Sequence, residues 1–209
     1  MFQPAVFCEA REDVLHGAIR AHPLATLITH EGGRIEADHV PMVLHAAGDA
    51  IVLRSHLNAA NPLPRSGAEV VDALAVFQGP QAYVSPGWYA SKREHGKAVP
   101  TWNYVSVHAR GALSIIRGDA AWLTDHLTAL SAQQESHRDE PWALSDAPAD
   151  YIARLLRRIV GLELRVSELT GVWKMSQNKS ETDRSGVVEG LRLDAKPDVS
   201  DLVAQLTTS

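Results

Sequence analysis

The apolar residues of this chain follow two different periods along its N-terminal half. Within residues 11–21 they recur at the spacing of one helix face, which predicts a helix that ends before Pro23. Beyond Pro23 they alternate with polar residues, which predicts strands over residues 25–29, 35–44, 50–57 and 70–77. Turns between these strands are expected at Glu31-Gly32-Gly33 and around Gly48-Asp49.

Residues 78–100 interrupt the alternation with prolines, glycines and the aromatic residues Tyr83, Trp88 and Tyr89. Such length and aromatic content predict a functional loop rather than a disordered one. Strand character resumes over residues 104–116 and again over 162–169. Between them we expect a helix from an N-cap at Asp119 to about residue 134, and a second helix over 151–160.

Short strands joined by glycine-containing turns favour an antiparallel barrel or sandwich over a sheet built from βαβ units. With helices at its periphery, the expected class is mainly β, or α+β. A chain of 209 residues buries roughly 70% of the surface that it exposes when unfolded, enough for one sizeable core. We therefore expect one domain over residues 1–193, followed by a polar, loosely attached C-terminal tail over 194–209.

Composition narrows the class of partner. The net charge of −5 argues against a protein that binds DNA through its phosphates, because such proteins carry a surplus of lysine and arginine. Residues 1–6 lack the length and the basic lead of a secretion signal, and no run reaches the roughly 20 apolar residues of a membrane span. Together with a single cysteine, Cys8, these features predict a soluble, cytoplasmic protein.

The common catalytic and nucleotide-binding motifs are missing. The sequence contains no GxGxxG, Walker, HExxH or GxSxG pattern. Its ten histidines show no tight ligand spacing with a cysteine or an acid, so no metal site is predicted. His39 and His56 fall on neighbouring predicted strands and can converge, although packed structural histidines are more common than ligands.

Four polar clusters lie between the apolar segments instead, at residues 38–41, 54–62, 77–104 and 173–178. They combine arginine, lysine, serine, asparagine and aromatic side chains. This mixture suits flavin mononucleotide (FMN), whose phosphate takes cationic, hydroxyl and amide donors and whose ring takes apolar walls with a few amides. The residues alone leave a second interpretation open, because Asn, Ser, Gly and Pro form ordinary turns in any protein.

The motifs within these clusters resemble the PaiB family. They are Phe-Gln-Gly-Pro-x-Ala-Tyr-Val-Ser-Pro-x-Trp-Tyr at 77–89, Val-Pro-Thr-Trp-Asn-Tyr at 99–104 and Lys-Met-Ser-Gln-Asn at 174–178. Asp-His-Val-Pro and Ser-His-Leu-x-x-x-Asn-Pro also match, so the resemblance covers about residues 1–191. PaiB-like proteins are described as FMN-binding negative transcriptional regulators related to pyridoxine-phosphate oxidases. The resemblance implies a split β-barrel of antiparallel strands and a homodimer, with FMN in the groove at the subunit interface.

The resemblance also implies which residues surround FMN. One edge of the isoalloxazine ring is expected to meet Asp38, His39, Val40 and Pro41. The ribityl phosphate is expected near Arg54, Ser55, His56, Asn58 and Asn61. The remaining contacts are expected from Gln78, Trp102, Asn103, Tyr104, Lys174 and Gln177. Trp88 and Tyr89 could serve either the site or the dimer contact.

The chain departs from its relatives at the phosphate. Oxidases of this superfamily hold that group with two basic side chains near the turn. Here only Arg54 is close in sequence, and Arg65 and Lys174 are more distant candidates.

Three functions stay open at this stage, and none assigns a catalytic residue. The first is an FMN-binding regulator or sensor that acts without a DNA-binding motif of its own, because no helix-turn-helix signal is present. The second is a flavin-dependent oxidoreductase on a small or nicotinamide substrate, with substrate-side candidates Tyr83, Tyr89, Lys92 and His95. The third is a haem-binding split barrel whose axial ligand is His39, His56 or His108.

Overall fold

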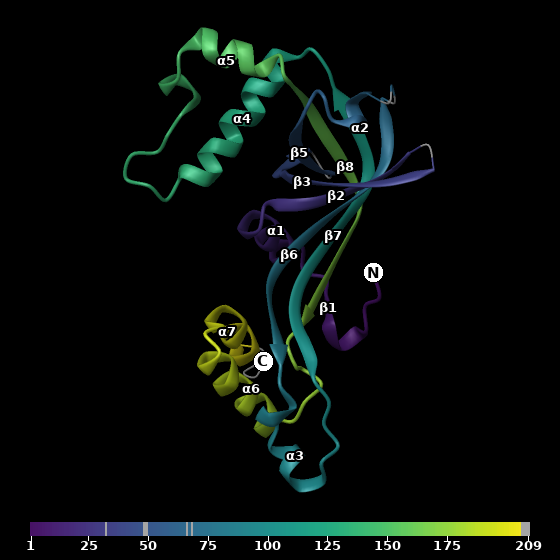
Figure 1. Ribbon diagram of the computed structural model, residues 1–209, viewed down its shortest axis with the longest axis vertical. Coiled ribbons are helices and arrows are strands. Elements are labelled where there is room, and N and C mark those ends of the chain that lie inside the picture. Colours follow the sequence, from purple (N-terminus) through teal and green to yellow (C-terminus); the bar gives the residue numbers. More distant parts are fainter. Residues whose placement is uncertain (32, 48–49, 66, 68, 206–209) are drawn as a thin grey trace. The chain divides into compact units, whose positions relative to one another are not determined.

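The structure, a computed structural model, describes residues 1–31, 33–47, 50–65, 67 and 69–205 (Figure 1). The chain divides into two compact units. Unit 1 comprises Met1–Ala18, Gln78–Val107 and Thr170–Ser209, and unit 2 comprises Ile19–Phe77 and His108–Leu169. Three long strands, β6 (Val70–Val84), β7 (Thr101–Ile116) and β8 (Ile159–Lys174), contribute residues to both units.

The described strands form one eight-stranded sheet in the order β3-β2-β6-β7-β8-β5-β4, and β1 (Cys8–Glu9) pairs with β8. The other strands are β2 (Leu24–Glu31), β3 (Arg34–Pro41), β4 (Val43–Ala47) and β5 (Ala50–Asn58). The pairs β2–β3, β2–β6, β4–β5 and β5–β8 are antiparallel. With the helices, this arrangement confirms the predicted mainly β, α+β class.

Several element boundaries differ from the sequence prediction. The predicted strand over 35–44 is divided at Met42, which is buried and whose backbone N–H donates to the carbonyl of Pro23 at 2.8 Å. The predicted helix over 151–160 is shorter, because Ile159 already begins β8 and α5 covers only Ala149–Leu156. The predicted turn at Gly48-Asp49, and Gly32 of the other turn, lie outside the described residues.

The loop expected over residues 78–100 is wrong for most of its length. Strand β6 continues to Val84 with alternating burial, so that Ala82 and Val84 point inward and Tyr83 points outward. The 3-10 helix η2 (Pro86–Trp88) and the helix α3 (Ala90–His95) follow. The sequence did not predict this continuation, because Gly79 and Pro80 interrupt it and both residue types are depleted in strands.

In unit 2 the helix α4 (Ala120–Glu135) packs against the strands β4 and β5. The helix begins at the predicted N-cap, since the Asp119 carboxylate accepts a hydrogen bond from the Trp122 backbone N–H at 2.9 Å. Trp122 in turn packs closely against Gly161 of β8, where an added Cβ would lie 2.3 Å from the indole ring. The unit also contains α2 (Pro62–Arg65) and η3 (Leu144–Asp146). Its most deeply buried side chains include Leu53 and Leu162.

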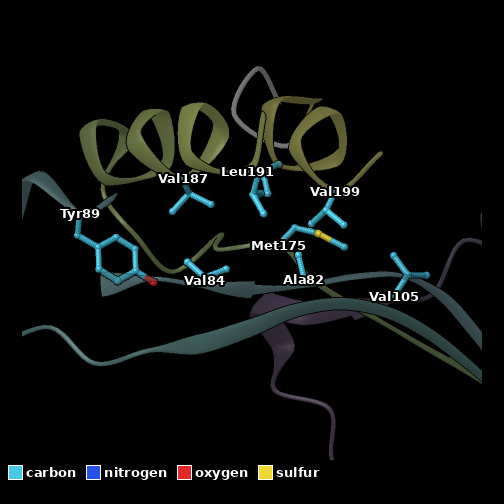
Figure 2. Packing of buried hydrophobic residues seen from close by; sticks show 9 residues of the cluster. Ala82, Val84, Tyr89, Val105, Met175, Val187, Leu191 and Val199 are labelled. Carbon is cyan, nitrogen blue, oxygen red and sulfur yellow. The ribbon is translucent and has the colours of Figure 1, made fainter. Parts of the chain in front are cut away.

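Unit 1 has its own apolar core beneath two C-terminal helices, α6 (Glu181–Leu193) and α7 (Pro197–Gln205). Figure 2 shows Val187, Leu191 and Val199 pointing from these helices toward Val84 and Met175. Val199 is 2% exposed and Val203 is fully buried, so α7 is packed rather than loosely attached as the sequence suggested. The N-terminal η1 (Ala5–Phe7) also belongs to unit 1, and the helix α1 (Glu12–Ala21), close to its predicted bounds, continues into unit 2.

Trp88 and Tyr89 belong to this core. The Tyr89 side chain is 1% exposed, and Trp88 packs against α6 so closely that a Cβ at Gly190 would lie 2.2 Å from its indole. Packing within unit 1 therefore accounts for both aromatic residues.

No helix in the described part of the chain is both long enough and apolar enough to cross a membrane.

Candidate functional site

The residues predicted to contact the cofactor fall into two groups, one in each unit. Those in unit 2 are Asp38, His39, Val40, Pro41, Arg54, Ser55, His56, Asn58 and Asn61. Those in unit 1 are Gln78, Trp102, Asn103, Tyr104, Lys174 and Gln177.

In unit 2 the end of β3 meets the end of β5 and the turn that follows it. The Asn61 side-chain amide donates to the Asp38 carboxylate at 2.7 Å, and the Ser55 hydroxyl donates to the Pro41 carbonyl at 2.7 Å. Asn58 closes the turn by accepting from the Ala60 backbone N–H at 2.9 Å. Two clusters that the sequence placed about twenty residues apart are therefore in direct contact.

The alternation of β5 separates Arg54 and His56 from Ser55, because successive strand residues point to opposite faces of a sheet. Ser55 is buried against β3, whereas Arg54 and His56 face α4. Arg54 Nε donates to the carboxylate of Glu163, its partner on β8, at 3.0 Å, and its guanidinium lies 5.2 Å from the Trp122 ring centre. The structure does not bring Arg54, Ser55 and His56 together around one point.

A histidine pair lies beside this arginine. His56 Nδ1 and His126 Nε2 are 3.1 Å apart, and the fully buried His126 stacks on Trp122 with ring centres 5.5 Å apart. Burial lowers the pKa of both imidazoles, and for His126 the nearby His56, His45 and Arg54 lower the pKa further, to about 4. Both rings are neutral at pH 7. His126 was not predicted as a residue of this region, although its position one helical turn after Trp122 indicates that the two side chains lie together.

In unit 1 the side chain of Asn103 points into the core. It is fully buried, its amide nitrogen donates to Ser176 Oγ at 3.0 Å, and that hydroxyl donates to the Asn103 oxygen at 3.1 Å. Trp102 and Tyr104 face the opposite side of β7, and Trp102 is 52% exposed. Asn103 thus ties β7 to the segment after β8, while its two neighbours face outward.

The other predicted polar groups of unit 1 also have partners within the unit. Lys174 Nζ donates to Thr101 Oγ1 at 2.6 Å, and burial together with Lys179 lowers the pKa of this lysine. The Gln177 amide folds back onto its own segment, where its oxygen accepts from the Met175 backbone N–H at 2.7 Å. Gln78 Nε2 donates to the carbonyl of Val105 at 3.3 Å.

A pocket of about 470 Å³ opens beside the outward face of β7 in unit 1. Its walls include Tyr83 and Trp102, whose rings meet edge to face with centres 6.2 Å apart and are 46% and 52% exposed. Gln81, Asp194 and Lys196 contribute the polar lining. We call this the Tyr83–Trp102 pocket. Its polar residues were not predicted from the sequence, although Gln81 lies two positions before Tyr83 and therefore shares its strand face.

The geometry gives little support to a metal site or to haem binding. Across the described residues, no group of three or more His, Cys, Asp or Glu side chains is placed to hold a metal ion. Among the haem candidates, His39 is exposed on the edge strand β3, and His56 is bonded to His126. The third candidate, His108, is half-buried, and burial lowers its pKa.

The substrate-side candidates of the oxidoreductase alternative are scattered in the same way. Lys92 and His95 are exposed on α3, Tyr89 is buried, and only Tyr83 lines the Tyr83–Trp102 pocket.

Comparison with known proteins places this fold in context. A family model described as "Putative FMN-binding domain" matches residues 1–168. The chain is 31% identical over 202 residues to "Protease synthase and sporulation protein PAI 2" of Bacillus subtilis (strain 168), covering 97% of this chain and 94% of that protein.

Two solved structures share the fold at low sequence identity. The FAD and heme binding protein from Mycobacterium smegmatis gives a TM-score of 0.57 at 18% identity, covering 85% of this chain and 78% of that one. The flavocytochrome Anf3 from Azotobacter vinelandii gives a TM-score of 0.51 at 14% identity, covering 86% and 75%. The predicted split-barrel fold is thereby confirmed.

Proposed function

Because this chain belongs to the FMN-binding domain family and is similar to PAI 2 over nearly its whole length, we propose that it is an FMN-binding regulator or sensor of the PaiB type. We propose that the protein regulates without a DNA-binding motif of its own. The net charge of −5 supports that part, since contacts with DNA phosphates require a basic surface. We also propose that the flavin domain extends beyond residue 193 and includes α7, because Val199 and Val203 belong to the core of unit 1.

The Tyr83–Trp102 pocket carries the proposal, because its side chains fit an isoalloxazine ring. Two half-exposed aromatic rings supply the apolar walls that a flavin takes. The Gln81 amide and the Lys196 ammonium can donate to the carbonyl oxygens of the ring, and the Asp194 carboxylate can accept from its N–H. FMN supplies electron or hydride transfer when it is bound, and the chain supplies binding and orientation.

Considered within unit 2 alone, we propose that the turn at residues 58–61, which the resemblance indicates, can take a phosphate group. The Asn61 side chain uses one N–H for Asp38 and retains a second hydrogen for a ligand oxygen. Arg54 lies four residues before this turn, but its pairing with Glu163 offsets its attraction for an anion. A phosphate held at this turn is therefore expected to contribute modestly to affinity.

We further propose a homodimer with FMN at the subunit interface, so that each site takes residues from two chains. Exposed apolar side chains on the strands of unit 2 support this assembly. Ile35 on β3 is 74% exposed, Leu24 on β2 is 62% exposed, and Val70 on β6 is 58% exposed. A second subunit would remove such residues from water.

Replacing Trp102 tests where the ring binds. In a titration followed by flavin fluorescence, Trp102→Leu is expected to weaken FMN binding about tenfold. Loss of an aromatic stacking surface costs roughly 1–3 kcal/mol, and about 1.4 kcal/mol corresponds to a factor of ten. The matched control is Trp142→Leu, which removes an exposed tryptophan of unit 2 and should leave the Kd unchanged. Equal affinities in all three proteins would place the ring elsewhere, whereas no saturable binding by the wild type would contradict the function itself.

A further inference from the structure

Unit 2 contains a pocket of its own, which none of the functions proposed above uses. Its volume is about 650 Å³, within the range of roughly 300–1,000 Å³ that is usual for small-molecule sites. Residues from α4, from α5 and from the first positions of β8 line it, and α4 and α5 lie next to each other in the unit (Figure 1). We call it the α4–α5 pocket.

The walls of the α4–α5 pocket are largely apolar. Leu123 and Val160 form buried parts of the lining, while Leu156 and Ile159 are only half-buried. Half-buried aliphatic side chains around a pocket leave apolar surface in contact with water. A ligand with a hydrocarbon body would cover that surface, and each methylene group that it buries would add to the affinity.

The charged lining of the α4–α5 pocket has one sign. Arg117 and Arg157 are the charged side chains among its lining residues, and no aspartate or glutamate of the described chain lines it. Arg117 is held in place, because its Nη2 donates to the Pro64 carbonyl at 2.7 Å. Arg157 is the exposed C-cap residue of α5. Two guanidinium groups beside an apolar wall favour an anionic head group, above all a carboxylate, whose geometry matches theirs.

Two carboxylates near the arginines along the chain, Asp119 and Asp150, are engaged elsewhere. Asp119 caps the N-terminus of α4 through the Trp122 backbone N–H, and Asp150 forms an ion pair with Arg154 one helical turn along α5. Neither of them lines the pocket. Among the described lining residues there are therefore two cations and no anion.

We infer that the α4–α5 pocket binds a small amphipathic carboxylate, with its hydrocarbon body against Leu156 and Ile159 and its carboxylate at Arg117 and Arg157. The ligand class follows from an apolar lining with two cations and no anion. This inference does not depend on the proposed flavin site. Ala59, which also lines the pocket, belongs to the turn at 58–61, so FMN itself has to be tested as a competing occupant.

The first experiment uses octanoate as the probe, titrated into the purified full-length protein by isothermal calorimetry. Octanoate is expected to bind saturably, and octylammonium and octan-1-ol at least about tenfold more weakly, because neither of them carries the negative charge that two guanidinium groups favour. Equal binding of octylammonium, or no saturable octanoate binding, would overturn the proposal. Displacement of octanoate by FMN would also overturn it, since the pocket would then belong to the flavin site.

Variants of α5 locate the ligand. Arg157→Gln is expected to weaken octanoate about tenfold, and Ala153→Trp to abolish saturable binding by filling the pocket. Both residues are exposed, and the thermal unfolding midpoint checks that each variant folds. Arg154→Gln is the matched control, because Arg154 lies on the same helix but outside the lining. Wild-type affinity in both Arg157→Gln and Ala153→Trp, or an equal loss in Arg154→Gln, would overturn the assignment.

Discussion

Replacing Gly111 of β7 with alanine is expected to lower the free energy of unfolding by about 3 kcal/mol, at the upper end of the usual cost of overpacking. An added Cβ would lie 1.9 Å from the carbonyl oxygen of Arg165 on the neighbouring strand β8 and 2.8 Å from its carbonyl carbon. The obstacle is backbone within a hydrogen-bonded sheet, so it cannot rotate away as a flexible side chain can. Relief requires the two strands to move apart, which weakens the ladder that joins them.

Gly17 of α1 provides the opposite case. Apart from its chain neighbours and the backbone of its own helix, no heavy atom of the described residues lies within 4 Å of a Cβ built there, and its backbone is not left-handed. Gly17→Ala is therefore expected to raise the free energy of unfolding by roughly 0.5–1 kcal/mol, because alanine loses less backbone entropy in a helix than glycine. Urea unfolding followed by tryptophan fluorescence measures both variants. A Gly111→Ala protein as stable as the wild type would show that β7 and β8 are not in this close contact.

Acidification from pH 7 to pH 4 is expected to remove about 3 kcal/mol of stability through His126 alone. The pKa of its buried imidazole is about 4, against an ordinary value of 6.5. Below pH 6.5 the unfolded chain takes up a proton that the folded chain does not, so stability falls with pH until the folded pKa is reached. A difference of about 2.5 pKa units corresponds to about 3 kcal/mol. The lowered pKa of His56 acts in the same direction.

The variant His126→Phe isolates this contribution. Phenylalanine retains an aromatic ring against Trp122 but cannot titrate, so the loss of stability between pH 6.5 and pH 4 should shrink by about 3 kcal/mol. His137→Gln, at an exposed histidine just beyond the end of α4, is the control and should follow the wild-type curve. Chemical unfolding at a series of pH values gives these curves. Parallel wild-type and His126→Phe curves would rule out His126 as the titrating group.

The elements that were predictable from sequence are those with a local signal. The helix before Pro23 and the N-cap at Asp119 agree with the structure to within one residue, because helix periodicity and capping depend on neighbours in the chain. The continuation of β6 past Gly79 and Pro80 could not be seen, since pairing within the sheet overrode two residues that disfavour strands. The burial of Val199 and Val203 likewise depends on partners far away in sequence.

The candidate site divides in the same way. Asp38 and Asn61, which come from two of the polar clusters, form a hydrogen bond, while their contact with a cofactor stays a prediction. The period of two in strands would also have separated Ser55 from Arg54, and Asn103 from Trp102, had it been applied to the motifs residue by residue. The pairing of Arg54 with Glu163 had no sequence signal, because it joins strands more than a hundred residues apart. Lys196 lines the Tyr83–Trp102 pocket because the C-terminal segment packs beside it, and nothing in the sequence indicated that packing.

Equilibrium dialysis of the purified wild-type protein against FMN tests the central claim most directly. The account predicts that FMN is retained on the protein side, saturates at an equimolar ratio to the chain and shows the visible absorption of a bound flavin. Its fluorescence should be quenched, because aromatic side chains such as Trp102 would lie against the ring. If FMN equilibrates evenly across the membrane even at high protein concentration, the chain shares the family's fold without binding its cofactor, and the proposed function is contradicted.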